Sequence, residues 1–243
     1  PAGSDSEPDA AEPVPLAEAP LVSGEDPAEA MREVLTSQAS FYDVDKDEVI
    51  TLDTYLDRAE EGDYEAPMDS QTDFLLGSFC GDGGMQAIVA VNGDHFLCES
   101  FLILHWYNGT VYGESSDTSR TFWSFKTDGS YDWSLEGTNY GRSYLAFYGE
   151  QFAPDVYLWT KPGPNDANGD YTGLYYHDDK EVSEDEFSAL YAQELEKPDA
   201  VWRTLTAENV DAALSTAAAT VKTEEQATGG DLPVPAAMEA DAR

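Results

Sequence analysis

Three turn dipeptides, each between runs of β-branched and aromatic residues, constrain the fold of this chain more than any other feature. They are Asn92-Gly93, Asn108-Gly109 and Asp128-Gly129. Such dipeptides tolerate the positive φ angles that two-residue hairpin turns require, and the flanking runs have the composition of strands. The segment from about residue 85 to residue 206 therefore predicts an antiparallel meander of about eight or nine strands.

Helix signals flank this β-rich region. Residues 26–29 place an Asp before a Pro and an acidic first turn, which predicts a helix that reaches about Ser40. A second short helix is predicted after Thr51, where apolar residues share one side. Residues 183–186 form a capping box that begins a C-terminal helix, and Lys197-Pro198 ends it. The prediction is a single α+β domain with an N-terminal helix pair and one C-terminal helix.

The two ends of the chain differ from this region in composition. Residues 1–25 are mainly Pro, Ala and acidic residues without Lys or Arg, which predicts a disordered acidic tether. Residues 207–243 are rich in Ala and polar residues, and we expect a weakly helical to disordered tail there. The predicted globular domain is therefore residues 26–206.

The charge of the chain excludes some partners. Its 243 residues include 49 Asp and Glu against 12 Lys and Arg, a formal net charge of −37. A field of this sign repels nucleic-acid phosphates, so DNA and RNA are excluded. No apolar run approaches the roughly 18 residues that a membrane-spanning helix needs, so no transmembrane segment is predicted.

One acidic segment has the alternate spacing of calcium-loop ligands at Asp43, Asp45 and Asp47. A calcium loop of this type needs Gly at its sixth position and a bidentate Glu at its twelfth, and the chain has Glu48 and Thr54 there. We therefore favour an acidic turn between two helices, with weak calcium binding as the alternative.

A second segment repeats the spacing at Asp166, Asn168 and Asp170, and His177 occupies the closing position. The surrounding stretch is rich in Pro, Gly and Asn, a composition typical of a loop. A loop is again favoured over weak ion binding.

Catalytic signatures are weak. His95, His105 and His177 fit no metal-binding helix pattern, and no nucleophile elbow is present. Cys80 and Cys98 either form one bridge across neighbouring strands of an exported protein or remain two buried thiols. Because 49 acidic residues make some close pair inevitable, a hydrolase with a carboxylate pair is kept only as a lesser alternative.

Aromatic residues are concentrated in the predicted meander, where 16 of the 29 lie between Phe101 and Trp159. The candidates for stacking on a sugar or peptide are Trp106, Trp123, Trp133 and Trp159. The competing interpretation places these rings in the core or in cross-strand pairs.

Several motifs of the chain recur together in one family. The matching segments are residues 52–56 for an L-x-x-Y-L helix, residues 105–113 for an H-Y-x-D/N-G-x-V-Y-G hairpin, residues 126–131 for a K-x-D-G-x-F/Y hairpin, and residues 181–187 with residues 201–202 at the end. In these motifs the chain resembles uncharacterised secreted or lipid-anchored proteins of Gram-positive gut anaerobes. The resemblance covers roughly residues 29–206, and its motifs are structural.

The resemblance implies export to the surroundings or the surface of a Gram-positive cell, with a lipid anchor on a cysteine before the tether. It also implies that residues 76–91 derive from a calcium loop, whose ligand positions fall at Ser78, Cys80, Asp82 and Gln86. Three of these four lack a carboxylate, so the loop is expected to keep its glycine turn without a metal.

The leading hypothesis from the sequence is a non-catalytic extracellular or cell-surface binding domain on an acidic tether, without a cofactor. Its ligand would be an unknown protein or glycan. A weak calcium-binding module is the alternative.

Overall fold

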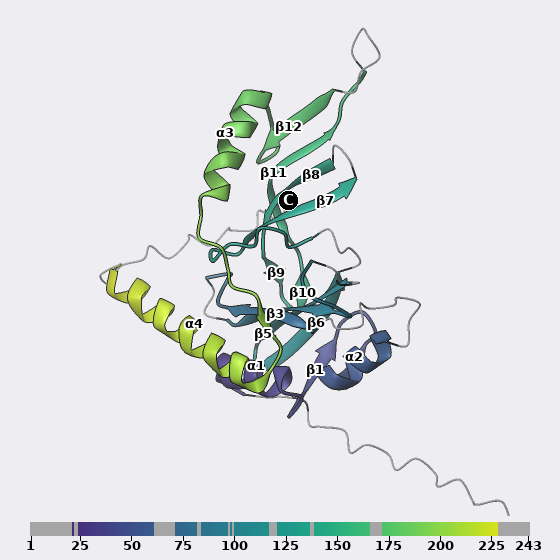
Figure 1. Ribbon diagram of the computed structural model, residues 1–243, viewed down its shortest axis with the longest axis vertical. Helices are drawn as coiled ribbons and strands as arrows, with labels where there is room; N and C mark the ends of the chain where they lie inside the picture. The colour runs from purple at the N-terminus through teal and green to yellow at the C-terminus, as the bar shows by residue number, and fades with distance from the viewer. Residues whose placement is uncertain are drawn as a thin grey trace, which may run out of the picture.

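The computed structural model describes residue 21 and residues 24–60, 71–81, 84–96, 98, 100–116, 121–136, 139–165 and 172–227. A seven-stranded sheet lies at one end of the long axis and a five-stranded sheet at the other (Figure 1). Four helices accompany them within these residues. The prediction of an α+β fold with antiparallel sheets is confirmed.

The larger sheet has the strand order β14-β3-β4-β5-β6-β1-β2. Its strands are β1 (Ser40–Asp43), β2 (Glu48–Thr51), β3 (Asp73–Gly77), β4 (Gln86–Val91), β5 (Ser100–Tyr107), β6 (Thr110–Ser116) and β14 (Arg203–Thr204). All pairings in this sheet are antiparallel except that of β1 with β6. Every residue of β4 is buried, which is expected of a central strand covered on both faces.

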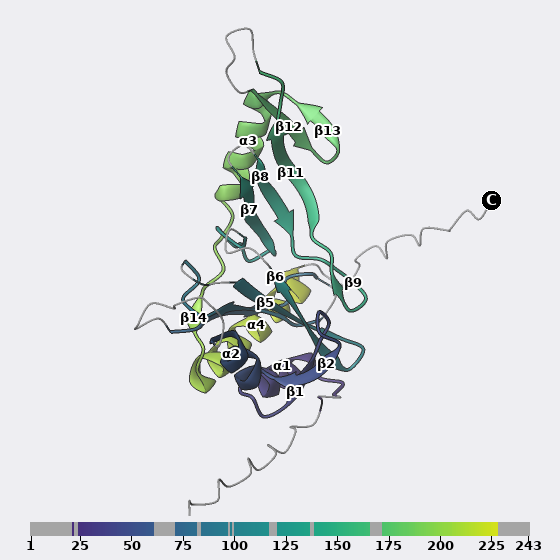
Figure 2. The same cartoon turned by 90° about the vertical axis from the view of Figure 1, so that its right-hand side faces the viewer.

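Three helices cover one face of this sheet: α1 (Pro27–Leu35), α2 (Leu52–Glu60) and α4 (Ala207–Ala227) (Figures 1 and 2). The Asp26 side chain accepts hydrogen bonds from the amides of Ala28 and Glu29, so the predicted cap of α1 is confirmed. Met31 and Val34 of α1 are fully buried against the sheet.

Helix α4 begins where a weakly helical tail was expected. Its first half belongs to the core, because Val210 is fully buried and Ala213 is 5% exposed. Arg32 of α1 and Asp211 of α4 also form an ion pair, with 2.7 Å between the guanidinium Nε and the carboxylate. The folded part of the chain therefore extends beyond residue 206.

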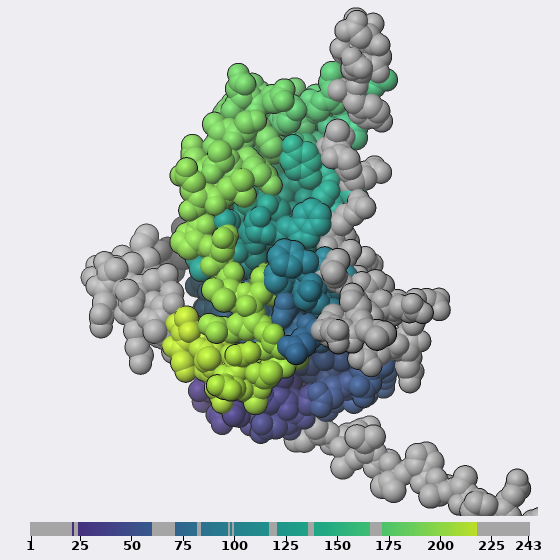
Figure 3. Space-filling model, viewed as in Figure 1, coloured from purple at the N-terminus to yellow at the C-terminus, as the bar shows by residue number. Residues whose placement is uncertain are grey.

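The smaller sheet has the order β13-β12-β11-β8-β7. Its strands are β7 (Ser130–Glu136), β8 (Asn139–Tyr144), β11 (Asp155–Pro162), β12 (Gly173–His177) and β13 (Lys180–Val182), and β9 (Phe147–Tyr148) pairs with β10 (Gln151–Phe152) beside it. Helix α3 (Glu184–Leu195) covers one face of this sheet, and Ser183 caps it through the amide of Glu186 as predicted. In the space-filling view, α3, α4 and the segment between them form one continuous side of the molecule (Figure 3).

An aromatic cluster joins the two sheets. Phe101 and Ile103 of the larger sheet pack with Phe122, Phe125 and Tyr131, which belong to β7 or the segment before it. Phe125 and Tyr131 stack with their ring planes 4° apart. Burial of these large rings fixes the position of the smaller sheet on the larger one.

Two local predictions were wrong. Asp43–Asp47 lies in the turn of the β1–β2 hairpin, and not in a turn between two helices. Asn92-Gly93 follows β4 but leads into a longer connection to β5, whereas Asn108-Gly109 does form the tight turn between β5 and β6. The sequence missed the first hairpin because its strands have only four residues each.

Candidate binding surface

A row of aromatic residues crosses the face of the smaller sheet that lies opposite α3. The registers of three strand pairs place Trp133, Gly141, Trp159 and Tyr176 directly beside one another on β7, β8, β11 and β12. Residues that face each other in this way project from the same side of a sheet. Two of the four Trp residues proposed for stacking, Trp133 and Trp159, are therefore brought onto one surface.

The α3 side of the sheet is identified by its contacts. Tyr140 and Tyr175 pack against Phe187 of α3, and they alternate along their strands with Gly141 and Tyr176. Since successive side chains of a strand point to opposite faces, the aromatic row lies on the other face. Among the described residues no helix covers that face (Figures 1 and 2).

The spacing of the strands sets the distance between the two Trp residues of the row. Neighbouring strands lie ~4.8 Å apart, so the backbones at Trp133 and Trp159 are separated by about 10 Å. Stacked rings have centroid distances of about 4.5 Å or more, so two such contacts span roughly the same distance. This separation matches the thickness of one flat ring stacked between two indoles. Trp133 also packs against the aromatic cluster between the sheets, and its indole N–H is buried without a hydrogen-bond partner in the described residues.

Gly141 has no side chain because the backbone of β11 comes too close. A Cβ atom there would lie 2.3 Å from the carbonyl oxygen of Leu158 and 2.8 Å from the Cα of Trp159. Strand packing alone thus requires glycine at this position. The backbone of β11 therefore occupies the place where a side chain of residue 141 would lie.

At the β12 end of the row, the aromatic rings contact each other and a lysine. Trp159 and Tyr176 stack with ring centroids 4.1 Å apart and planes 9° apart. The ammonium group of Lys161 lies 4.7 Å from the centre of the Tyr176 ring. Tyr176 was not predicted from the sequence, because only the register of β11 with β12 places it beside Trp159.

The opposite face of the same sheet holds buried charges. Arg142 is fully buried, and its Nη1 lies 2.8 Å from Oδ1 of Asp132. The Tyr157 hydroxyl lies 3.3 Å from the Arg142 Nε and donates to Glu194 of α3 at 2.5 Å. Burial opposes the charge of Arg142, but attraction to Asp132 and the contact with Tyr157 raise its pKa above the ordinary value.

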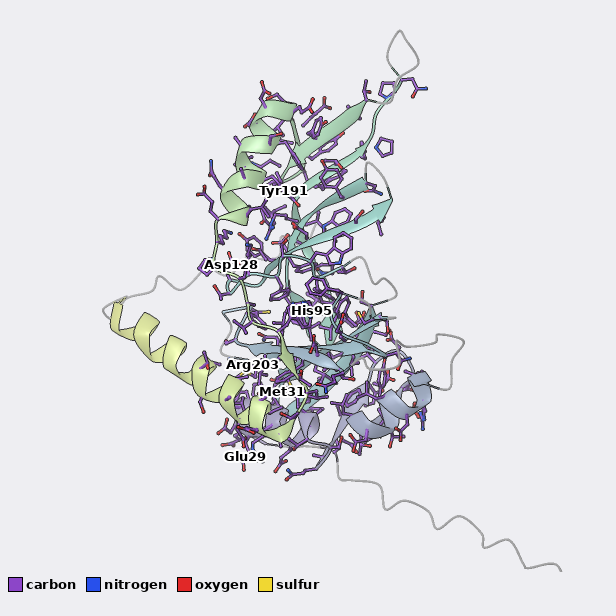
Figure 4. The ribbon with its side chains drawn as sticks, in the orientation of Figure 1. Glu29, Met31, His95, Asp128, Tyr191 and Arg203 are labelled. Atoms are coloured by element: carbon purple, nitrogen blue, oxygen red, sulfur yellow. The ribbon has the colours of Figure 1, made fainter. Side chains whose placement is uncertain are left out.

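A lysine extends this network to the end of α3. Lys197 Nζ lies 2.6 Å from Glu194 and 2.8 Å from Asp128, which is labelled in Figure 4. Burial would raise the pKa of Asp128, but hydrogen bonds from Lys197 and Ser130 lower it. These carboxylates hold α3 on the sheet through ion pairs with Arg142 and Lys197.

The other two Trp candidates lie apart from the row. Trp106 donates its indole N–H to the Gly24 carbonyl at 3.1 Å and packs against the core of the larger sheet. Trp123 is 45% exposed and forms backbone hydrogen bonds with Asp132 at the outer edge of β7. Because Asp132 faces α3, Trp123 lies on that side of the sheet.

The first acidic triplet does not converge on one point. Asp43 accepts from the amides of Asp45 and Lys46, Asp45 accepts from the Ser115 amide, and Asp47 accepts from a tyrosine hydroxyl. In the described part of the chain, no group of three His, Cys, Asp or Glu side chains is arranged to hold a metal ion. Asp166, Asn168 and Asp170 lie outside the described residues.

Cys80 and Cys98 do not form a disulfide in this structure; Cys98 is buried and Cys80 is half-buried. Cys80 lies 3.1 Å from the Leu145 carbonyl, and burial raises the pKa of Cys98 to about 12. Gln86, at an expected metal-ligand position, accepts instead from the amides of Phe79 and Cys80. A side-chain amide thus shapes the loop at a position where the resembled family has a metal ligand.

One histidine has a carboxylate partner. Nδ1 of His95 lies 2.7 Å from Asp73, and its ring stacks on Trp202 at 4.8 Å. His105 is buried, stacks on Phe147 and contacts the Gly149 carbonyl. These carboxylate, carbonyl and ring contacts tie both histidines into the fold.

Comparison with protein-family models, with curated proteins and with solved structures found no match. Among the described residues, no helix is long and apolar enough to cross a membrane. The argument about function therefore depends on the geometry of the site.

Proposed function

We propose that this protein is a non-catalytic glycan-binding domain, exported and held at the cell surface by its acidic N-terminal segment. The observation that carries the proposal is the aromatic row itself, in which Trp133 and Trp159 lie two strands apart on one face of the smaller sheet. Sugar rings present flat C–H faces, and indole rings bind such faces through large apolar contact at little cost in side-chain entropy. A glycan is favoured over a protein ligand because the row has the dimensions of one ring.

The net charge of the chain favours an uncharged ligand over a polyanion. With a net charge of −37, the domain repels polyanions at long range, but an uncharged polysaccharide is unaffected. Lys161 is a cation beside the row and can donate hydrogen bonds to sugar hydroxyl groups once its ammonium turns from the Tyr176 ring. The described residues supply no assembled catalytic group beside the row, which favours binding over turnover.

The experiment is affinity electrophoresis in gels containing xylan, hydroxyethylcellulose, galactomannan or polygalacturonate. We expect retardation by at least one of the three neutral polysaccharides and none by polygalacturonate. Trp159→Ala should weaken the affinity obtained from the retardation by roughly tenfold or more, which corresponds to ~1.4 kcal/mol or more of binding free energy. Trp123→Ala is the matched control, since it removes a more exposed indole from the α3 side and should leave binding unchanged.

Two results would contradict the proposal. One is the absence of retardation by all neutral polysaccharides; the other is an equal loss of binding in the two variants. Release of reducing sugar from the retarding polysaccharide, abolished by a single carboxylate substitution, would support the hydrolase alternative instead. Trp159→Phe keeps a ring at the site and separates loss of stacking from loss of folding.

A further inference from the structure

A cavity of about 340 Å³ lies at the edge of the larger sheet, away from the aromatic row. Its walls are the end of β3, the loop after it, residues 199–203 and the side of α4 that faces β3. Apolar groups dominate the lining, with Leu75, Leu76, Phe79, Val201 and Ala213 among them. By the ~30 Å³ that one water molecule occupies in the liquid, the cavity holds on the order of ten non-hydrogen atoms.

The charged residues that line this cavity are Asp199 and Arg203. Asp199 is neutralised by Lys126, whose Nζ lies 2.6 Å from its carboxylate. Arg203 is half-buried, and within the described residues no carboxylate lies in ion-pair distance of it. Figure 4 places Arg203 beside α4. The local charge of the cavity is therefore positive, although the chain has a net charge of −37.

The backbone of β3, at the edge that pairs with β14, adds polar groups to the cavity. The amide of Leu205 donates to the Thr72 carbonyl, and Arg203 lies opposite Phe74 in the same antiparallel pair. Because every second residue of a strand points its backbone groups to the same side, the N–H and C=O of Leu76 also point toward this edge. Strand β14 starts only at Arg203, so no described strand pairs with Leu76 there.

We propose that this cavity binds a small amphipathic carboxylate. The carboxylate would pair with Arg203 and accept from the Leu76 amide, and an apolar body of roughly eight carbons would fill the space below α4. A guanidinium pairs with a carboxylate through two parallel hydrogen bonds, which are stronger than neutral ones. This site lies on the other sheet, and it does not depend on the proposed glycan surface.

The room in the cavity comes from small residues of α4. Ala213 and Ala217 lie one helical turn apart and face β3 across the cavity, with Thr216 beside them. A larger side chain at Ala217 would occupy the space that the apolar body needs. Filling the cavity therefore tests the apolar part of the proposal, and removing the charge of Arg203 tests its polar part.

The test is isothermal titration calorimetry of the whole chain with octanoate and with octan-1-ol at 0.15 M salt. Octanoate should bind about ten times more tightly than octan-1-ol, since a hydrogen bond between charged groups is stronger than one to a neutral hydroxyl. Arg203→Gln should weaken the binding of octanoate about tenfold and leave the binding of octan-1-ol unchanged. Ala217→Leu should weaken the binding of both compounds.

Lys180→Gln is the matched control, because it removes an exposed cation from β13 at the far end of the molecule. It should leave octanoate binding unchanged. Equal affinity for octanoate and octan-1-ol, no binding of octanoate at millimolar concentration, or an equal effect of Lys180→Gln and Arg203→Gln would overturn the proposal. An unchanged melting temperature of Arg203→Gln without ligand shows that the variant is folded.

Discussion

Asp43 shows at the residue scale how this acidic chain tolerates a buried carboxylate. The side chain is 1% exposed, its Oδ1 accepts from two backbone amides, and its Oδ2 has no hydrogen-bond partner in the described part of the chain. Burial raises the pKa of Asp43 above its ordinary value. The ionised form is therefore better solvated in the unfolded chain than in the folded one.

This arrangement predicts a pH-dependent effect of Asp43→Asn. A raised folded-state pKa means that the contribution of Asp43 to stability is full below the ordinary pKa and is lost as pH rises through the raised value. The variant keeps the acceptor at Oδ1 and has no charge, so at pH 7 it should be more stable than the parent chain by about 1 kcal/mol. At pH 3 the two proteins should unfold at the same urea concentration.

Asp155→Asn is the control, because Asp155 is exposed and its removal changes the net charge equally. A destabilised Asp43→Asn variant at pH 7 would contradict this account of the residue. Melting temperatures measured with calcium distinguish this explanation from a metal site at Asp43. If Asp43 were a ligand, millimolar calcium would raise the melting temperature of the parent chain and not that of the variant.

At the scale of elements, α4 is the helix whose role was underestimated from sequence. Its Ala-rich composition predicts a weak helix with little apolar face, and only contact with β3 shows which residues are buried. We expect Val210→Ala to destabilise the protein by about 1–3 kcal/mol, because the side chain is fully buried in the core. Urea unfolding followed by circular dichroism measures the change.

Ser215→Ala on the exposed side of the same helix should change stability by less than about 0.5 kcal/mol. Equal effects of the two substitutions would mean that α4 does not contribute to the core.

Local signals in the sequence predicted where helices and turns begin and end better than they predicted which strands pair and in which register. The caps at Asp26 and Ser183 and the Asn108-Gly109 turn were predicted correctly, since each depends on residues that are close along the chain. The row from Trp133 to Tyr176 depends on the registers of three strand pairs, and a shift of one residue would reverse any of them. Of the four Trp residues proposed from the sequence, two lie in this row, and Tyr176 was not among the proposed residues.

At the scale of the whole molecule, each of the two sheets carries one of the two proposed binding sites. The smaller sheet uses one face for the α3 ion-pair network and the other for the aromatic row, and the larger sheet carries the cavity with Arg203 at its edge. Joined by the aromatic cluster between them, the sheets form a rigid support for both sites. The central claim is that the aromatic row of Trp133, Trp159 and Tyr176 binds a sugar ring.

The most direct test is the ¹H–¹⁵N spectrum of the five tryptophan indole groups during titration with xylohexaose, cellohexaose and mannohexaose in turn. The account predicts that at least one of these sugars shifts the signals of Trp133 and Trp159 in a saturable way. The signals of Trp106, Trp123 and Trp202 should stay in place, because their rings lie away from the row. Shifts confined to Trp123 or Trp202, or no saturable shift with any of the three sugars, would contradict it.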